Sequence, residues 1–255
     1  MSHADDALKN REVWTKANAE YTDRRARQAW AQEEIDWGMF SGPESEIGAL
    51  GEVGGRDVIE LGCGTAYFGA WLAKRGARVT GVDVTPAQLE TARRMQEEFD
   101  LQFPLIEASA EEVPLPDASF DLAVSEYGAS IWCDPDRWIG EAARLLRPGG
   151  RLVFLCNSPL SILCAPDEGK VEERLLRPYT DFGRMEWPGE DEGVNYHLPH
   201  GEMIRVLGEK GFVVEALHER LTPDSTTDHE YYDFVPAEWA RRWPAEEIWV
   251  ARKSV

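Results

Sequence analysis

A glycine-rich turn followed by one acidic residue is the part of this sequence best suited to bind a cofactor. The stretch VIELGCGTA, residues 58–66, is an apolar run that turns on Gly62 and Gly64. A strand that ends in such a turn and opens a helix lets the backbone approach a nucleoside-type ligand. Asp83 ends the next apolar run, where its carboxylate can accept two hydrogen bonds from a ribose diol. Together these residues predict a nucleoside cofactor.

Two residues near the turn distinguish between cofactors. A dinucleotide site favours a third glycine three residues beyond Gly64, a position that Tyr67 occupies. Glu60, just before the turn, would repel a pyrophosphate, whether its carboxylate contacts the cofactor or hydrogen-bonds the backbone. S-adenosylmethionine has a ribose and an adenine but no phosphate, and its ammonium group suits an acidic turn. The turn therefore favours S-adenosylmethionine over a nicotinamide or a flavin.

The segments around the turn alternate between strand and helix patterns. From residue 57, short apolar runs alternate with helical patterns as far as the strand RLVFLCN, residues 151–157. Such βαβ alternation builds a parallel sheet with right-handed crossovers. A helix over residues 201–211 and strands over 212–220 and 246–253 complete the expected α/β fold.

The length fits a single domain with one inserted segment. For 255 residues, one α/β domain is the default expectation. We expect an N-terminal helical cap over residues 1–50, a cofactor-binding core over 57–157, and the C-terminal part of the sheet over 200–255. Residues 158–199 contain several prolines and little periodicity, which predicts a lid or a substrate-side insert.

The charge and the cysteines exclude several classes of partner. Lys and Arg total 27 against 47 Asp and Glu, a net charge of −20, so nucleic acids and anionic membranes are poor partners. No apolar run approaches the roughly 20 residues that span a bilayer, and the opening MSHADDALKN has no secretory pattern. The four cysteines have no CxxC spacing, which predicts neither a disulfide framework nor a metal site. We expect a cytoplasmic protein.

Four motifs in order resemble those of the class I S-adenosylmethionine-dependent methyltransferases. They are VIELGCGTA, GVDVTPAQLE, EASAEEVPLPDASFDLAVS and EAARLLRPGGRLVFL, and the resemblance is dense over residues 57–156. It implies a Rossmann-like, mostly parallel seven-stranded sheet with helices on both faces and an antiparallel last strand. It also implies S-adenosylmethionine as the cofactor and methyl transfer as the activity.

The resemblance assigns cofactor roles to the residues that match these motifs. Gly62 and Gly64 would approach the methionine part of the cofactor, and Asp83 would bind the ribose. The further positions that it implies are Val84 against the adenine, Gln88 near the ribose or adenine, Ser109, Ala110 and Glu111 at the adenine edge, and Ser125 beside the methionine amine. Position 109 is Ser where the family often has Asp. The adenine amino group would therefore hydrogen-bond to the Ser109 hydroxyl, to Glu111 or to water.

Aromatic residues near the N-terminus have two interpretations. Tyr21, Trp37 and Phe40 could close over the cofactor, as such segments often do in this family. Alternatively, they fill the core, as aromatic residues commonly do.

The candidates for a general base lie after two different strands. His197 and His200 bracket LP in the stretch YHLPH, and a neutral imidazole can deprotonate a hydroxyl near pH 7. A shared metal is disfavoured because no third ligand lies close in sequence. Glu126 and Tyr127 follow another apolar run and are the rival candidates.

The sequence therefore predicts in-line methyl transfer to a small molecule, enclosed by the N-terminal helices and the insert. The acceptor atom, oxygen, nitrogen or carbon, stays open. A non-catalytic sensor or assembly factor and a nicotinamide-dependent oxidoreductase are the alternatives.

Overall fold

The computed structural model describes residues 3–40, 42–188 and 193–255. Seven strands form its central sheet. In chain order they are β3 (Asp57–Leu61), β4 (Arg78–Asp83), β5 (Leu105–Glu107), β6 (Phe120–Glu126), β7 (Leu146–Asn157), β10 (Phe212–Arg220) and β11 (Glu246–Lys253).

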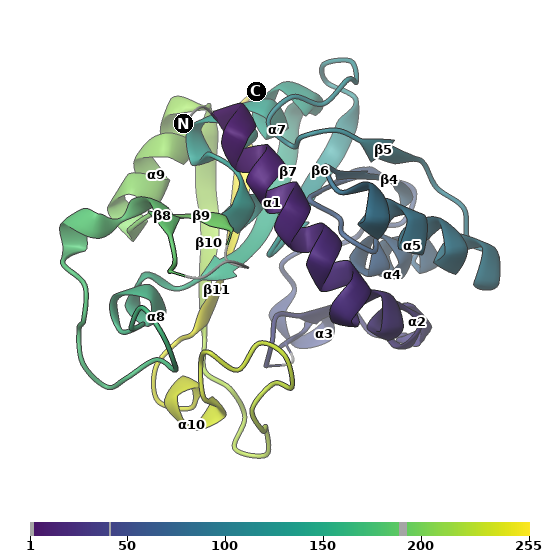
Figure 1. Ribbon diagram of the computed structural model, residues 1–255. Coiled ribbons are helices and arrows are strands. Elements are labelled where there is room, and N and C mark those ends of the chain that lie inside the picture. The colour runs from purple at the N-terminus through teal and green to yellow at the C-terminus, as the bar shows by residue number, and fades with distance from the viewer. Residues whose placement is uncertain (1–2, 41, 189–192) are drawn as a thin grey trace.

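The strand order is β10-β11-β7-β6-β3-β4-β5 (Figure 1). Strands β3 to β7 pair in parallel, whereas β11 is antiparallel to both of its neighbours, β7 and β10. This arrangement confirms the predicted seven-stranded, mostly parallel sheet. The start of β11 therefore lies at the same edge of the sheet as the carboxyl ends of the parallel strands.

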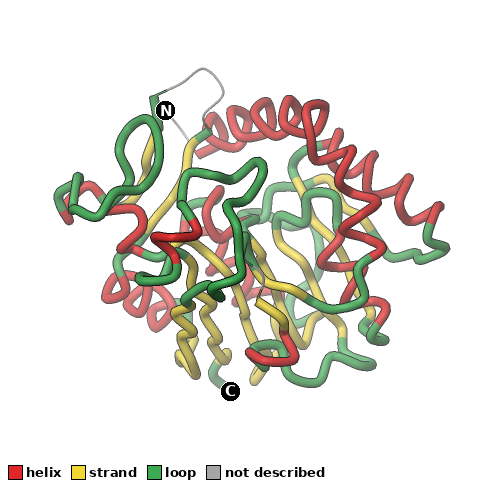
Figure 2. Tube along the Cα trace, turned by 90° about the horizontal axis from the view of Figure 1, so that it is seen from below, coloured by secondary structure: helices red, strands yellow, loops and turns green. Residues whose placement is uncertain are grey.

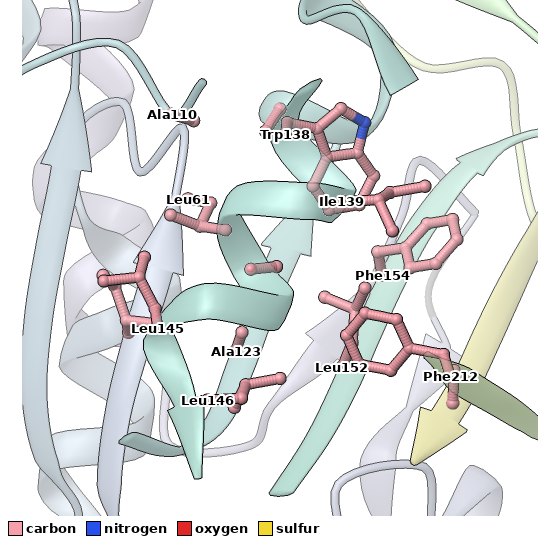
Figure 3. Packing of buried hydrophobic residues seen from close by; sticks show 14 of the residues in the cluster. Leu61, Ala110, Ala123, Trp138, Ile139, Leu145, Leu146, Leu152, Phe154 and Phe212 are labelled. Carbon is pink, nitrogen blue, oxygen red and sulfur yellow. The ribbon is translucent and has the colours of Figure 1, made fainter. Parts of the chain in front are cut away.

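Helices cover both faces of the sheet (Figure 2). They are α4 (Tyr67–Lys74), α5 (Pro86–Glu98), α6 (Ala129–Trp132), α7 (Pro135–Leu145) and α9 (His200–Glu209). On β7, Leu152 and Phe154 face α7, where Trp138 packs edge-to-face on Phe154 (Figure 3). The intervening Val153 and Leu155 face the opposite side, which α4 covers. A strand buried on both faces is apolar throughout, which explains the continuous run in the sequence.

The first 50 residues form helices, as predicted, and then a short hairpin. These elements are α1 (His3–Ala17), the π-helix η1 (Asn18–Thr22), α2 (Asp23–Ala31), β1 (Asp36–Trp37), β2 (Gly42–Pro43) and α3 (Glu44–Ile47). In Figure 1, α1 crosses the molecule from β9 (Val194–His197) to α5, and it contacts both. The N-terminal helices thus lie against the core of the domain.

The inserted segment is more regular than its sequence predicts. It contains α8 (Pro159–Leu163), the 3-10 helix η2 (Tyr179–Asp181) and the antiparallel pair of β8 (Gly183–Glu186) with β9. Asn10 of α1 holds this pair through its side chain, because Oδ1 accepts from Val194 N at 2.7 Å and Nδ2 donates to Val194 O at 2.9 Å. Because Asn10 and Val194 are far apart in the sequence, no local periodicity predicts this pairing. After β10, the short helix α10 (Ala237–Ala240) leads to β11.

Within the described residues, no helix combines the length and apolar character needed to cross a membrane.

Candidate active site

The glycine turn after β3 has the backbone conformation that its residues suggested. Gly62 has φ +76° and Gly64 has φ +52°, both in the left-handed region that glycine adopts without strain. A Cβ on Gly62 would lie 2.5 Å from Ala129 N, so this glycine lets the chain after β6 pack against the turn. A Cβ on Gly64 would meet Gln88 Oε1 at 3.8 Å, an ordinary contact. Gly64 is therefore the more open position of the two.

Asp83 lies at the end of β4, directly beside this turn. Its Oδ2 accepts a hydrogen bond from Gly64 N at 2.8 Å, and its Oδ1 accepts one from Thr85 N at 2.8 Å. Burial raises the pKa of Asp83, while these amides lower it. These amides orient the carboxylate at the carboxyl end of β4, where a ribose diol would bind.

Glu60 has a structural partner. It is 3% exposed, and its Oε2 accepts from Gly69 N at 2.8 Å. Helix α4 begins after Ala66, which has no side-chain oxygen to cap it, so Glu60 satisfies one of the free amides at the helix start. Burial raises the pKa of Glu60 well above its ordinary value, and the charges of Glu126 and Asp83 raise it further.

These residues fit S-adenosylmethionine and not a dinucleotide. Three carboxylates, those of Glu60, Asp83 and Glu126, influence one another around the turn. Such a site attracts a sulfonium or an ammonium group and repels a pyrophosphate. The open Gly64 and the positioned Asp83 would hold the nucleoside, and the bound cofactor would supply an electrophilic methyl group.

The other residues expected at the adenine differ in their burial and in their contacts with the protein. Gln88 is 2% exposed and lies beside Gly64, and Val84 is partly exposed next to Asp83. Ser109 Oγ accepts from Glu111 N at 3.2 Å in a local turn. The cofactor contacts of these residues stay predictions.

Four of the expected cofactor contacts are engaged with the protein itself. Ala110 packs in the core on the α7 side, and Glu111 Oε1 accepts from Asp134 N at 2.8 Å, at the start of α7. Ser125 is fully buried, and its hydroxyl donates to Leu61 O at 2.8 Å. Trp37 is 1% exposed and packs against Phe68, with ring centroids 4.7 Å apart.

Trp37 and Phe40 favour the second of the two interpretations given from the sequence, and a cofactor contact by Trp37 stays a prediction. Both side chains are buried in apolar clusters, Trp37 with the α4 side of the sheet and Phe40 with α10. The indole Nε1 of Trp37 already donates to Glu44 Oε2 at 2.8 Å. Rings with so little free surface fill the core.

Glu126 ends β6 on the same face of the sheet as Glu246 of β11. Glu126 Oε2 accepts from the hydroxyl of Tyr67 at 2.5 Å, and its Oε1 accepts from Gly38 N at 3.2 Å. Glu246 has a parallel arrangement, because its Oε1 accepts from the hydroxyl of Tyr127 and from Met39 N, both at 2.6 Å. Two successive amides of one loop are thus held by two buried carboxylates.

Burial changes the proton affinities of this group. Desolvation raises the pKa of Glu126 and raises that of Glu246 to about 7. Glu126 combines a raised pKa with a position at the carboxyl edge of the sheet, where ligands of such folds bind. Glu126 is therefore a candidate proton acceptor at this edge of the sheet.

The two histidines lie in different surroundings. His197 ends β9 and is 6% exposed, and burial together with the charge of Arg177 lowers its pKa to about 4. His200 begins α9 and its Nε2 lies 2.7 Å from Glu247 Oε2. Because Glu247 follows Glu246 on β11, it points to the opposite face of the sheet from Glu126. The structure therefore does not bring His200 and Glu126 together, and the catalytic roles of all three candidates stay predictions.

Sequence reasoning named Tyr21, whose cofactor contact stays a prediction, but missed the two tyrosines that join it and η1 to the loop before α10. The ring of Tyr21 stacks on Tyr231 with centroids 4.9 Å apart, and its hydroxyl lies 2.9 Å from that of Tyr232. We call these three residues the tyrosine clasp. Arg25 adds to it through its Nη1, 3.2 Å from Nε2 of His229. The stretch HEYY, residues 229–232, was a possible signal, but the sequence gives no indication of its partner.

The fold and this site define a class of protein. A mostly parallel seven-stranded sheet with an antiparallel β11, a glycine turn after β3 and an acid at the end of β4 is the arrangement of the class I S-adenosylmethionine-dependent methyltransferases.

Comparison with known proteins agrees. Residues 59–154 match the family described as a methyltransferase domain. An uncharacterized methyltransferase of Mycobacterium bovis is 37% identical over 203 residues, which cover 74% of each chain. The crystal structure of an S-adenosylmethionine-dependent methyltransferase from Mesorhizobium loti has a TM-score of 0.65 and 28% identity, covering 82% of this chain and 96% of that one.

A second similar structure has ligands. The 1,6-didemethyltoxoflavin-N1-methyltransferase of Burkholderia thailandensis, solved with 1,6-didemethyltoxoflavin and S-adenosylhomocysteine, has the same fold, with a TM-score of 0.59 and 16% identity, covering 100% of this chain and 92% of that one. The chain belongs to the class I S-adenosylmethionine-dependent methyltransferases. It is an enzyme whose cofactor is S-adenosylmethionine, which overturns the nicotinamide and sensor alternatives.

Proposed function

We propose that the enzyme methylates a small molecule enclosed beneath the N-terminal helices and the tyrosine clasp. The observation that carries this proposal is the way η1 bridges the two halves of the site. Thr22 of η1 donates to Gln88 Oε1 at 3.3 Å, beside the glycine turn. Tyr21 of the same helix contacts the hydroxyl of Tyr232. The negative charge of Glu126 helps to raise the pKa of Tyr232, so this hydroxyl lies within electrostatic range of Glu126.

The N-terminal helices and the tyrosine clasp together form a cover that we call the roof. The roof therefore extends from the cofactor residues to Glu126, the candidate base. A space closed in this way accommodates a small acceptor and excludes a folded macromolecule. The net charge of −20 also disfavours a nucleic acid. A π-helix such as η1 often marks a functional site, which agrees with its place here.

In this proposal, Asp83 and Gly64 orient the nucleoside, and the roof excludes water from the methyl group. Holding an acceptor in line with the methyl group can supply roughly 7–11 kcal/mol of the barrier. Glu126 accepts the proton that an oxygen or nitrogen acceptor loses, and the Tyr67 hydroxyl keeps its carboxylate oriented. A cytosolic location belongs to the same proposal, and it is supported by four cysteines that are all free.

The test is transfer of label from methyl-tritiated S-adenosylmethionine into a cell extract divided into metabolites and macromolecules. We expect label in the metabolite fraction with the wild type. Glu126→Gln should reduce the rate by about 10²- to 10⁴-fold while leaving the affinity for S-adenosylhomocysteine, which lacks the sulfonium charge, unchanged. Label confined to the macromolecules would refute the small-molecule proposal, and an unchanged rate for Glu126→Gln would refute the role of Glu126.

A further inference from the structure

Three side chains with metal-ligating atoms meet at the start of α9, away from the cofactor residues. His200 opens α9, Glu219 lies near the end of β10, and Glu247 lies at the start of β11. One ligand atom of each lies within 4.8 Å of those of the other two. His197 is not a member of this cluster, so the pairing of the two histidines considered from the sequence is replaced by a different set.

The register of the sheet places the two acids directly opposite each other. Glu219 and Glu247 are partners in the antiparallel pair of β10 and β11, so their side chains lie on the same face. Like charges in this position destabilise a sheet. A cation between the two carboxylates would remove this repulsion.

Glu247 is held as metal-binding carboxylates often are. It is 2% exposed, and its Oε1 accepts from Trp249 Nε1 at 2.8 Å. This bond fixes the carboxylate and leaves Oε2 directed at His200 Nε2, 2.7 Å away. Support of a ligand by a neighbouring donor is a regular feature of metal sites.

His200 presents its imidazole Nε2 to the cluster from the first residue of α9. One imidazole and two carboxylates are ligands that zinc accepts, and a site with three protein ligands keeps a position open for water. The side chain of His200 is 39% exposed and Glu219 is also exposed, so an ion can reach the cluster from solvent.

We propose that His200, Glu219 and Glu247 bind one divalent transition-metal ion, with Zn²⁺ as the probe. The site joins α9 to the edge of the sheet formed by β10 and β11. It lies on the opposite face from Glu126 and does not depend on the methyl-transfer proposal.

The experiment is titration of the chelator-treated full-length protein with Zn²⁺ at pH 7.5, followed by calorimetry and thermal unfolding. We expect one ion to bind per chain and the unfolding temperature to rise. Glu219→Gln removes an exposed ligand and leaves the His200–Glu247 contact in place, so it should weaken binding by at least tenfold without unfolding the protein. His200→Gln should do the same, and Glu90→Gln, an exposed acid on α5, should bind Zn²⁺ like the wild type.

Co²⁺ provides an independent readout that separates this site from the cysteines. Ligation by nitrogen and oxygen gives visible bands without the near-ultraviolet charge-transfer band of a cobalt thiolate. We expect the visible bands in the wild type and their loss in Glu219→Gln. No stoichiometric binding of Zn²⁺, a thiolate spectrum, or equal affinity in the wild type, Glu219→Gln and His200→Gln would each overturn the proposal.

Discussion

Replacing Asp83 by Asn should weaken cofactor binding more than any other single change in the glycine turn. The carboxylate of Asp83 accepts from Gly64 N and Thr85 N, which orient it to accept hydrogen bonds from a ribose diol. A charge-assisted hydrogen bond contributes about 1.5–3 kcal/mol, so its loss raises Kd about 10- to 100-fold. Asn also turns an NH₂ group towards one of the two amides, which loosens the turn.

The assay is calorimetry with both S-adenosylmethionine and S-adenosylhomocysteine. Both ligands contain the ribose, whereas only the first carries the sulfonium charge, so an effect through the ribose weakens both. Because burial raises the pKa of Asp83, wild-type affinity should fall as the pH is lowered through that pKa, and the variant should lose this dependence. Asp100→Asn makes the same chemical change at an exposed position and is the matched control.

Two results would refute this reasoning. Unchanged affinity for both ligands would show that Asp83 does not bind the ribose. A loss for S-adenosylmethionine alone would show that Asp83 acts on the sulfonium through its charge.

Three further perturbations test the packing around the site. The pKa of Glu246 is about 7 in the fold against an ordinary 4.5, so the folded state holds an extra proton between these values and loses stability as the pH rises through them. Glu246→Gln should reduce this slope by about 1.4 kcal/mol per pH unit in urea unfolding from pH 5 to 7, and an unchanged slope would assign it to other buried acids. Asn10→Ala removes both backbone hydrogen bonds to Val194 and should cost about 3 kcal/mol, or roughly 6–12 °C in Tm, by calorimetry. Tyr231→Ala removes the stacking on Tyr21 and should speed cofactor dissociation in stopped-flow measurements with little change in Tm, and an unchanged rate would separate the clasp from the cofactor.

The sequence predicted the parts of the site that depend on neighbouring residues. The turn at Gly62 and Gly64 and the position of Asp83 follow from the alternation of strands and helices, because each strand end is marked locally. Contacts between distant segments leave no such mark. Tyr21 and Tyr232 are 211 residues apart, and nothing in either stretch indicates the other.

The same reason explains why the sequence left two interpretations of Trp37 open and did not reveal the roles of the acids. A tryptophan beside a glycine fits a ligand site and a core equally well until its neighbours are known. Similarly, Glu246 and Glu247 are adjacent in the sequence, but the alternation of β11 directs them to opposite faces of the sheet. Only Glu246 lies on the same face of the sheet as Glu126, the candidate base.

The negative potential of the site is built into the fold and does not depend on the cofactor. Glu60, Asp83 and Glu126 each accept a hydrogen bond from a backbone amide, so their carboxyl groups are held in place before any ligand binds. Carboxyl groups fixed in this way need no reorganisation when a cation arrives. Methyl transfer converts a sulfonium into a neutral thioether, which this potential attracts less. The acids that favour binding of the methyl donor therefore also favour release of the product.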